Sequence, residues 1–190
     1  MAKTVRDTVQ DAQQVLVAGG GIGGIAAALA LVQCGFKVKV LEQAAQLGEI
    51  GAGLQVGPNG FAAFDALGVG DIARSKAVYT DFMVMHDALD EYQVGHIPTG
   101  ATFVKRFGNP YAVIHRADAH SALLEGAIAS DRIEIATSTQ VQRVEQDDDG
   151  VTVFDAKGGQ HRGVALIGVR VAKALDEGCT RGDMAHLVLV

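Results

Sequence analysis

Three glycines and one acid near the start of the chain have the spacing of a site for a dinucleotide. Gly19, Gly21 and Gly24 form the pattern GxGxxG, and Glu42 follows Gly24 by 18 positions. The first such glycine permits a tight turn, the second lets the backbone approach a pyrophosphate, and the third lets a helix pack closely on a sheet. A carboxylate at Glu42 can accept hydrogen bonds from a ribose hydroxyl and would repel a ribose 2′-phosphate. The pattern therefore disfavours NADP, but it does not separate NAD from FAD.

The elements that must position these residues are readable on both sides of the glycines. An apolar run from Val15 to Val17 predicts a buried strand, an Ala/Leu-rich stretch from Ile25 to Val32 predicts a helix, and Lys37 to Leu41 predicts a second strand that ends at the acid. The helix N-terminus would offer unpaired N–H groups and a partial positive charge to phosphates. The alternative without a ligand is a glycine-rich turn beside a solvated glutamate.

The rest of the chain alternates between helical and strand-like patterns. Helices are predicted over 58–67, 71–77 and 116–129, and strands over 111–115, 133–136, 140–146, 150–154 and 164–167. Residues 78–104 are strand-like, and this pattern includes the stretch TFVKRF that begins at Thr102. The run from Asp147 to Gly150 has the composition of a hairpin turn. We expect an α/β fold whose first strands are parallel, with helices on both faces and the ligand at the carboxyl ends of the strands.

Composition excludes several classes of partner. The chain has 190 residues, 48% of them apolar, and a formal net charge of −6 without a basic cluster. We therefore expect no nucleic-acid partner, and no membrane partner, since no apolar run approaches the roughly 20 residues of a membrane-spanning helix. The two cysteines, Cys34 and Cys179, form no CxxC or metal-ligand pattern, so we expect no metal site and a cytoplasmic location. Cys34 is expected on the inner side of the first helix.

Four segments resemble the flavin-dependent aromatic-ring hydroxylases, and within them the salicylate and 3-hydroxybenzoate 6-hydroxylase group. They are VLVAGGGIGG, VLEQAAQLGEIGAGLQVGPNG, FGNPYAVIHRADAHSALLEGA and QVQRVEQDDDGVTVFD. They follow the order and spacing of that family over about residues 14–168. The resemblance implies a Rossmann-like FAD-binding fold and favours FAD over NAD.

The resemblance also implies roles for individual residues. Glu42 matches the acid that binds the adenosine ribose, and Arg116 matches an arginine that reaches toward the flavin nucleotide. Gln55 ends a loop that runs past the flavin ring, and Val141 lies where the family makes a main-chain contact with adenine. The planar cationic fork of Arg116 suits a phosphate or a flavin carbonyl, with a surface ion pair as the alternative. Gln55 could bind ribityl hydroxyls or face solvent.

The activity that the resemblance implies is hydroxylation of a phenolic aromatic acid. FAD, reduced by NADH, would react with O₂, and an OH group would pass to a ring such as that of 3-hydroxybenzoate to give gentisate. NADH as the donor is an expectation that the residues do not separate from NADPH. No catalytic residue is assigned: the histidines stand without an evident acid partner, and a lone histidine is usually structural.

The chain departs from the family pattern after its last predicted strand. The family continues with Gly-x-Asp-Gly, whereas Gly168 is followed by Val-Arg-Val-Ala, and a partial late motif appears as TRGDMAH with Asp183. We therefore expect a flexible arm over residues 1–13, an FAD-binding domain over 14–168 with an inserted β segment at about 78–104, and an atypical tail over 169–190. The expected substrate-domain sheet is incomplete, and the chain is expected to be truncated and weakly active or inactive. Apolar surface meant for the missing part could support a homodimer.

Two other functions remain open from the residues. The first is a non-catalytic dinucleotide-binding or interaction module that uses an exposed apolar face. The second is an NAD-dependent dehydrogenase, although the GEIGAGLQ loop and the helix that begins at Arg116 are not needed by such an enzyme.

Overall fold

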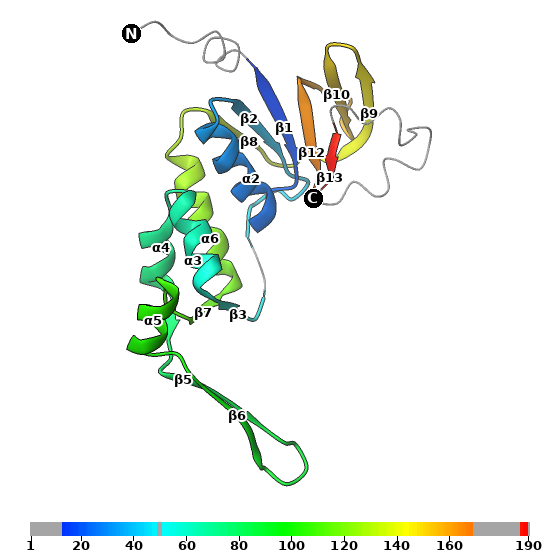
Figure 1. Ribbon diagram of the computed structural model, residues 1–190. Coiled ribbons are helices and arrows are strands. Elements are labelled where there is room, and N and C mark those ends of the chain that lie inside the picture. Colours follow the sequence, from blue (N-terminus) through cyan, green and yellow to red (C-terminus); the bar gives the residue numbers. More distant parts are fainter. Residues whose placement is uncertain (1–12, 49–50, 169–186, 190) are drawn as a thin grey trace, which may run out of the picture. The chain divides into compact units, whose positions relative to one another are not determined.

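The computed structural model describes residues 13–48, 51–168 and 187–189 (Figure 1). The chain divides into two compact units, which are residues 1–48 with 123–190, and residues 49–122. Most of the predicted arm and tail, with Asp183, lies outside the described residues, and the predicted limits at 13, 78–104 and 168 stay predictions. In the described parts, no helix has the length and apolar character that crossing a bilayer requires.

The first unit is built on a five-stranded parallel sheet. Its strands are β1 (Gln14–Ala18), β2 (Lys37–Leu41), β8 (Ile133–Ala136), β12 (Ala165–Gly168) and β13 (Leu187–Leu189), in the order β13-β12-β1-β2-β8. Val15 pairs with both Val38 and Ala165, which places β1 inside the sheet. The side chains of Leu16 and Val17, which point to opposite faces, are both fully buried, as expected for parallel strands covered on both sides.

Helix α2 (Ile22–Gln33) connects β1 to β2 and buries an apolar stripe that contains Ile25, Ala28 and Leu29. The predicted strand–helix–strand unit is therefore present. Cys34 follows the last helical residue and is exposed, so its expected place on the inner side of the helix was wrong. The cysteine lies where the chain leaves the helix, beyond the reach of the helical periodicity that suggested the inner side.

A three-stranded antiparallel sheet completes the first unit. It consists of β9 (Val141–Asp147), β10 (Gly150–Asp155) and β11 (Gln160–Gly163), in the order β11-β10-β9, and the predicted turn from Asp147 to Gly150 joins β9 to β10. Val151 and Val153 form a buried cluster with Leu16, Leu41 and Leu166 of the parallel sheet. This face was expected to carry a helix, but an antiparallel sheet packs against it because β10 presents two buried valines there.

The second unit combines short helices with two antiparallel sheets. Its elements are β3 (Gly53–Val56), α3 (Pro58–Ala66), α4 (Gly70–Lys76), β4 (Val78–Tyr79), β5 (Phe82–His86), β6 (Gln93–Pro98), α5 (Ala101–Phe107) and β7 (Ala112–His115). Strands β3, β7 and β4 form one sheet with β7 in the middle, and β5 pairs with β6 as a separate hairpin. Helix α6 (Arg116–Ile128) follows β7 directly, and its residues fall in both units.

The strand-like interpretation of TFVKRF was wrong, because these residues lie in helix α5. Gly100 precedes the helix with an extended backbone, and Gly108 ends it in the left-handed conformation at φ +81°. A left-handed glycine is a common stop for a helix, since it lacks the Cβ penalty. The β-branched and aromatic residues favour a strand intrinsically, and the two flanking glycines together with the tertiary context override that preference.

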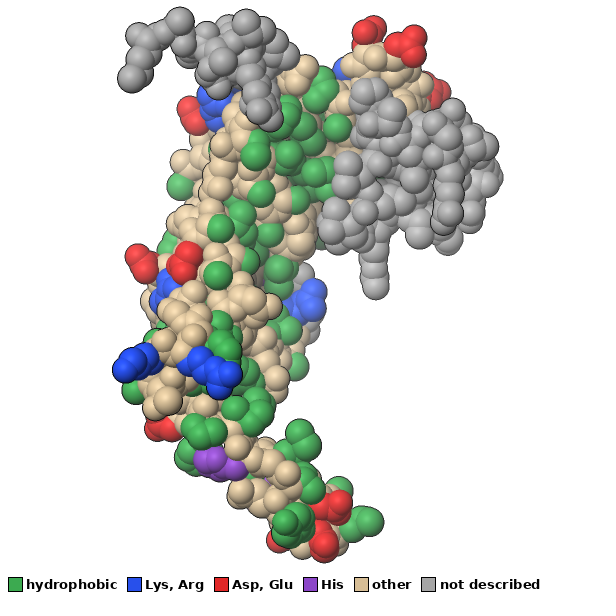
Figure 2. All heavy atoms as spheres, viewed as in Figure 1, with side chains coloured by type: hydrophobic (Ala, Val, Ile, Leu, Met, Phe, Trp, Pro, Cys, Tyr) green, Lys and Arg blue, Asp and Glu red, His purple; other side chains and the backbone are tan. Residues whose placement is uncertain are grey.

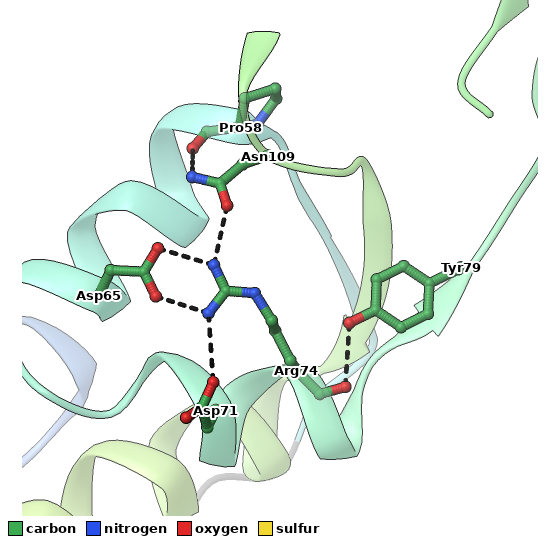
Figure 3. A network of polar contacts seen from close by, with 6 residues as sticks. All are labelled: Pro58, Asp65, Asp71, Arg74, Tyr79 and Asn109. Atoms are coloured by element: carbon green, nitrogen blue, oxygen red, sulfur yellow. Dashed lines mark hydrogen bonds and ion pairs between the residues drawn. The ribbon is translucent and has the colours of Figure 1, made fainter. Parts of the chain in front are cut away.

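One arginine ties several elements of the second unit together (Figure 3). Arg74 of α4 donates two hydrogen bonds to the carboxylate of Asp65 at 2.5 and 2.7 Å and a third to Oδ1 of Asn109 at 2.8 Å. Its guanidinium also lies 5.4 Å from the ring centroid of Phe61, and its main-chain carbonyl accepts a hydrogen bond from the hydroxyl of Tyr79. The helix pair α3–α4 is thereby joined to β4 and to the segment that leads into β7.

Candidate functional site

The predicted glycine turn lies at the carboxyl end of β1, where the chain enters α2. Gly19 has φ +110°, a conformation that L side chains rarely adopt, and its N–H donates to the carbonyl of Leu41 at 2.9 Å. A Cβ atom on Gly24 would lie 1.9 Å from the carbonyl oxygen of Gly19. The first turn of the helix therefore lies so close to Gly19 that any side chain at position 24 would clash with the backbone.

The first turn of α2 keeps backbone donors for a ligand. Gly21 precedes the helix, and no side chain among the described residues caps it. The first N–H groups of a helix have no partner within the helix, and the helix dipole adds a partial positive charge at this end. A glycine turn that leads into a helix N-terminus, where the backbone N–H groups have no partner within the helix, is an arrangement that binds phosphate groups.

Glu42 is held against the glycine turn by its own hydrogen bonds. Its Oε2 accepts the N–H of Gly20 and its Oε1 accepts the N–H of Ala44, both at 2.7 Å. Its main-chain N–H donates to Ala136 and its carbonyl accepts from Thr139, which fixes the backbone between the ends of β2 and β8. Each carboxylate oxygen has more than one lone pair, so the half-buried carboxylate can still accept a hydroxyl group. The structure thus brings Gly19, Gly21, Gly24 and Glu42 to one edge of the parallel sheet.

Val141, the predicted adenine contact, is the first residue of β9. The preceding loop is joined to the acid by the bond between the Thr139 N–H and the Glu42 carbonyl. The side chain of Val141 packs in part against the buried cluster of Leu16 and Leu41, so its main chain is the part available to a ligand. The position is compatible with a main-chain contact, which stays a prediction.

Gln55 and Arg116 both lie in the second unit, Gln55 on strand β3 and Arg116 at the start of α6. Gln55 in β3 is exposed and pairs with Val113 of β7, and Arg116 follows β7 as the first residue of α6. The N–H of Arg116 donates to the carbonyl of Ala52 at 3.2 Å. A Cβ atom on Gly51 would lie 2.8 Å from Cδ of Arg116, so the stem of the arginine runs directly over a side-chain-free backbone. The structure therefore places Gln55 on β3 and joins Arg116, which follows β7, to the segment that leads into the same strand.

Two features of the structure, one in each unit, were not predicted from the sequence. The glycine-rich loop contains strand β3, whose partner β7 lies some 60 positions later, and no local pattern announces that pairing. His161 does have an acid partner: its Nε2 lies 2.9 Å from Oδ2 of Asp155 across the tight turn between β10 and β11. Hydrogen bonds from His161 and from the N–H groups of Gly159 and Lys157 hold the pKa of Asp155 below its usual value. This pair stabilises a turn, and among the described residues no group of three metal-binding side chains occurs.

A family model described as an FAD binding domain matches residues 12–165. The chain belongs to this family. The match confirms the Rossmann-like FAD-binding fold read from the four segments and favours FAD over NAD, which removes the main support for a dehydrogenase. The parallel sheet with its antiparallel additions also confirms the predicted fold class.

Relatives of this FAD-binding domain have named activities. The chain is 61% identical over 173 residues to the 3-hydroxybenzoate 6-hydroxylase of Polaromonas naphthalenivorans (strain CJ2), which covers 91% of this chain and 43% of that protein. It is 47% identical over 183 residues to the 3-hydroxybenzoate 6-hydroxylase of Klebsiella oxytoca, with 96% and 44% covered. The resemblance to the flavin-dependent aromatic-ring hydroxylases is thereby confirmed. The chain spans less than half the length of these relatives.

A solved structure shares the fold. Klebsiella pneumoniae HpxO complexed with FAD and uric acid is 30% identical and has a TM-score of 0.69, with 84% of this chain and 39% of that chain covered. A p-nitrophenol 4-monooxygenase from Pseudomonas putida DLL-E4, 22% identical, has a TM-score of 0.76 over 86% of this chain and 44% of that one. The second likeness is one of fold alone.

Proposed function

We propose that this chain is the FAD-binding portion of a monooxygenase that hydroxylates a phenolic aromatic acid. The substrate proposed is 3-hydroxybenzoate with gentisate as product, NADH as electron donor and O₂ as oxidant. The identity of 61% to a 3-hydroxybenzoate 6-hydroxylase over 91% of the chain supports this reaction. The FAD-binding family match over residues 12–165 supports the cofactor, and the observation that carries the dinucleotide site is Glu42, whose carboxylate accepts the N–H of Gly20 beside the turn that opens α2.

The residues of the turn fit the ADP portion of FAD. The space that a Cβ atom on Gly24 would need is filled by the carbonyl of Gly19, so the turn is as tight as the family pattern demands. Backbone N–H groups at the start of α2 would bind the diphosphate, and Glu42 would accept a hydroxyl of the adenosine ribose. Val141 would contact adenine through its main chain. Each of these groups binds and orients, and none transfers a proton.

In the second unit, Arg116 and Gln55 are proposed as contacts of the flavin portion. Arg116 is an exposed residue whose stem lies on Gly51, and its planar guanidinium has the donor geometry that suits a phosphate or a flavin carbonyl. The exposed amide of Gln55 would bind ribityl hydroxyls. When bound, FAD supplies the redox chemistry, and the protein supplies position, electrostatics and exclusion of water. Since the chain covers 43% of the Polaromonas relative, we propose that by itself it binds FAD weakly and turns over slowly or not at all.

The test is a titration of the purified chain with FAD and with ADP, followed by calorimetry and by flavin absorption. The wild type should bind both ligands, and Glu42→Ala should weaken both about tenfold or more, because a hydrogen bond to a charged group contributes about 1.5–3 kcal/mol. Glu134→Ala is the matched control, since Glu134 is an exposed carboxylate on the neighbouring strand β8. No FAD uptake by the wild type, or unchanged affinity in Glu42→Ala, would contradict the proposal.

The second candidate function is a dinucleotide-binding interaction module without catalysis. The observation that favours it is the hairpin β5–β6, which exposes large apolar side chains such as Met85 and Val94. Oxidation of NADH that accelerates on addition of 3-hydroxybenzoate would exclude this candidate. Binding of FAD without any such oxidation, together with a dimer in light scattering, would support it.

A further inference from the structure

His115 occupies a position that fixes which of its ring nitrogens carries the proton. It is the last residue of β7 and directly precedes α6, and its Nδ1 accepts the main-chain N–H of Ala117 at 3.2 Å. This is the hydrogen bond of a helix N-cap, from the second helical residue to the capping side chain. Because Nδ1 acts as the acceptor, the proton of the neutral ring lies on Nε2.

The strand register places this ring on the same face as the proposed flavin contact Gln55. In β7, Ala112 and Ile114 are buried, so Val113 and His115 point to the opposite side. Strand β3 runs antiparallel, with Gly53 opposite His115 and Gln55 opposite Val113. The outer face of this sheet therefore carries the exposed side chains of Gln55 and His115 next to the side-chain-free Gly53.

The donor on this face is unused within the described structure. Among the residues that the structure describes, Nε2 of His115 has no hydrogen-bond partner, whereas Nδ1 is committed to the helix cap. Gln55 lies on the same face of the sheet, and Arg116 directly follows His115 in the chain. An N–H donor on the face that also carries an exposed amide is suited to a ligand that presents oxygen acceptors.

We propose that His115 donates its Nε2–H to an oxygen atom of the flavin portion of FAD, a ring carbonyl or a ribityl hydroxyl. The helix cap orients the ring, and Gly53, which lies opposite His115, adds no side chain to this face of the sheet. This inference rests on the proposed function, and it adds a binding residue that the family-based assignment of Arg116 and Gln55 does not contain.

Two substitutions separate the donor of His115 from its cap. His115→Ser keeps a hydroxyl that accepts the Ala117 N–H but removes the donor that reaches outward. His115→Gln keeps an outward N–H donor but is a poor cap. If His115 binds the flavin, His115→Ser should weaken FAD binding about three- to tenfold with little change in melting temperature. His115→Gln should lower the melting temperature while it retains most of the FAD affinity.

Comparison of FAD with ADP locates the effect. ADP lacks the flavin portion, so its affinity should be the same in wild type and His115→Ser, while the shift of the flavin absorption band on binding should change in His115→Ser. Equal FAD affinity of wild type and His115→Ser would overturn the proposal, and so would an equal loss of FAD and ADP affinity. A wild-type chain that binds ADP but not FAD, or neither ligand, would instead overturn the proposed function on which this inference rests.

Discussion

Gly24 shows how strongly a single residue can constrain a binding turn. Its missing side chain allows the start of α2 to lie against the carbonyl of Gly19, and that carbonyl belongs to rigid backbone rather than to a flexible side chain. The spacing of the glycines predicted a close approach of helix and sheet. The structure adds that the closest atom belongs to the turn itself, so the shape of the phosphate-binding loop depends directly on Gly24.

We expect Gly24→Ala to distort this turn and to destabilise the protein by about 1–3 kcal/mol, because the added methyl group would overlap backbone atoms. ADP and FAD affinity should fall at least about tenfold, since misplaced N–H groups no longer converge on the diphosphate. Urea unfolding and calorimetric titration measure the two effects. Gly48→Ala is the control, as a Cβ atom there meets nothing within 4 Å. Equal behaviour of the two variants would show that the turn tolerates a side chain.

At the scale of elements, the sheet β9–β11 depends on charges at its hairpins. Arg162 of β11 donates hydrogen bonds to both carboxylate oxygens of Asp147 at the end of β9, at 2.7 and 2.5 Å, and these bonds lower the pKa of Asp147 from 3.8 to about 2. A carboxyl group whose pKa is lower in the folded state stabilises that state above its unfolded pKa. The contribution is present above about pH 4 and is lost as the pH falls through about 2.

Asp147→Asn should therefore reduce stability at pH 6 and have a much smaller effect at pH 2, where the wild-type carboxyl group is about half protonated in the folded state. The effect should be small, because the pair is exposed to solvent. Urea unfolding at the two pH values, with an NMR titration of the Asp147 carboxyl group, measures it. Asp148→Asn on the same turn is the control. A midpoint near 4 for Asp147 would contradict the expected pairing with Arg162.

The elements of the second unit depend on Arg74, which joins α3, α4 and the segment before β7. We expect Arg74→Met to lower the melting temperature by about 2–5 °C, since it removes the paired bonds to Asp65 and the bond to Asn109. Arg106→Met is a suitable control, because Arg106 is exposed on α5 and its guanidinium lies over the ring of its neighbour Phe107. Thermal unfolding of the two variants should differ. Equal melting temperatures would show that the network adds nothing measurable.

At the scale of the whole molecule, the hairpin β5–β6 leaves apolar surface uncovered. Figure 2 shows hydrophobic side chains gathered along this hairpin, and Phe82, Met85, Leu89, Tyr92, Val94 and Ile97 are each exposed by about half or more. A surface of this kind usually marks an interface or a site of aggregation. Because the chain spans less than half of its relatives, this surface could be covered by the rest of a longer protein or by a second copy.

We therefore expect the chain to associate as its concentration rises. The double substitution Met85→Lys with Val94→Lys should shift the protein toward the monomer, because charges on an exposed strand oppose edge-to-edge contact. Light scattering across a concentration series measures the mass. The control adds the same two charges on α3 at Ala62 and Ala66, both exposed. A wild-type mass that stays monomeric at all concentrations would refute the expectation.

Local patterns were sufficient to locate two strands of the first unit's parallel sheet. The predicted bounds of β2 at Lys37–Leu41 and β8 at Ile133–Ala136 coincide with the structure, because short apolar runs flanked by turns identify buried strands without reference to partners. The glycine spacing and the acid after β2 likewise encode the binding turn locally. The family match over residues 12–165 then identified the part of the chain that contains this turn as an FAD-binding domain.

Tertiary structure decided the features that depend on how strands pair and segments pack. Strand β3 forms only because β7 lies beside it, the stretch at 101–107 is helical against its own preference, and His161 finds Asp155 only once β10 and β11 pair. The hydrogen bond from the N–H of Gly20 to the carboxylate of Glu42 also forms only in the folded sheet, which brings the ends of β1 and β2 together. Amino-acid sequence determined the types of residue and their local order, since turns and periodicity are short-range. Which of these residues meet was decided by packing, because burial and hydrogen bonding act between any segments that the fold brings into contact.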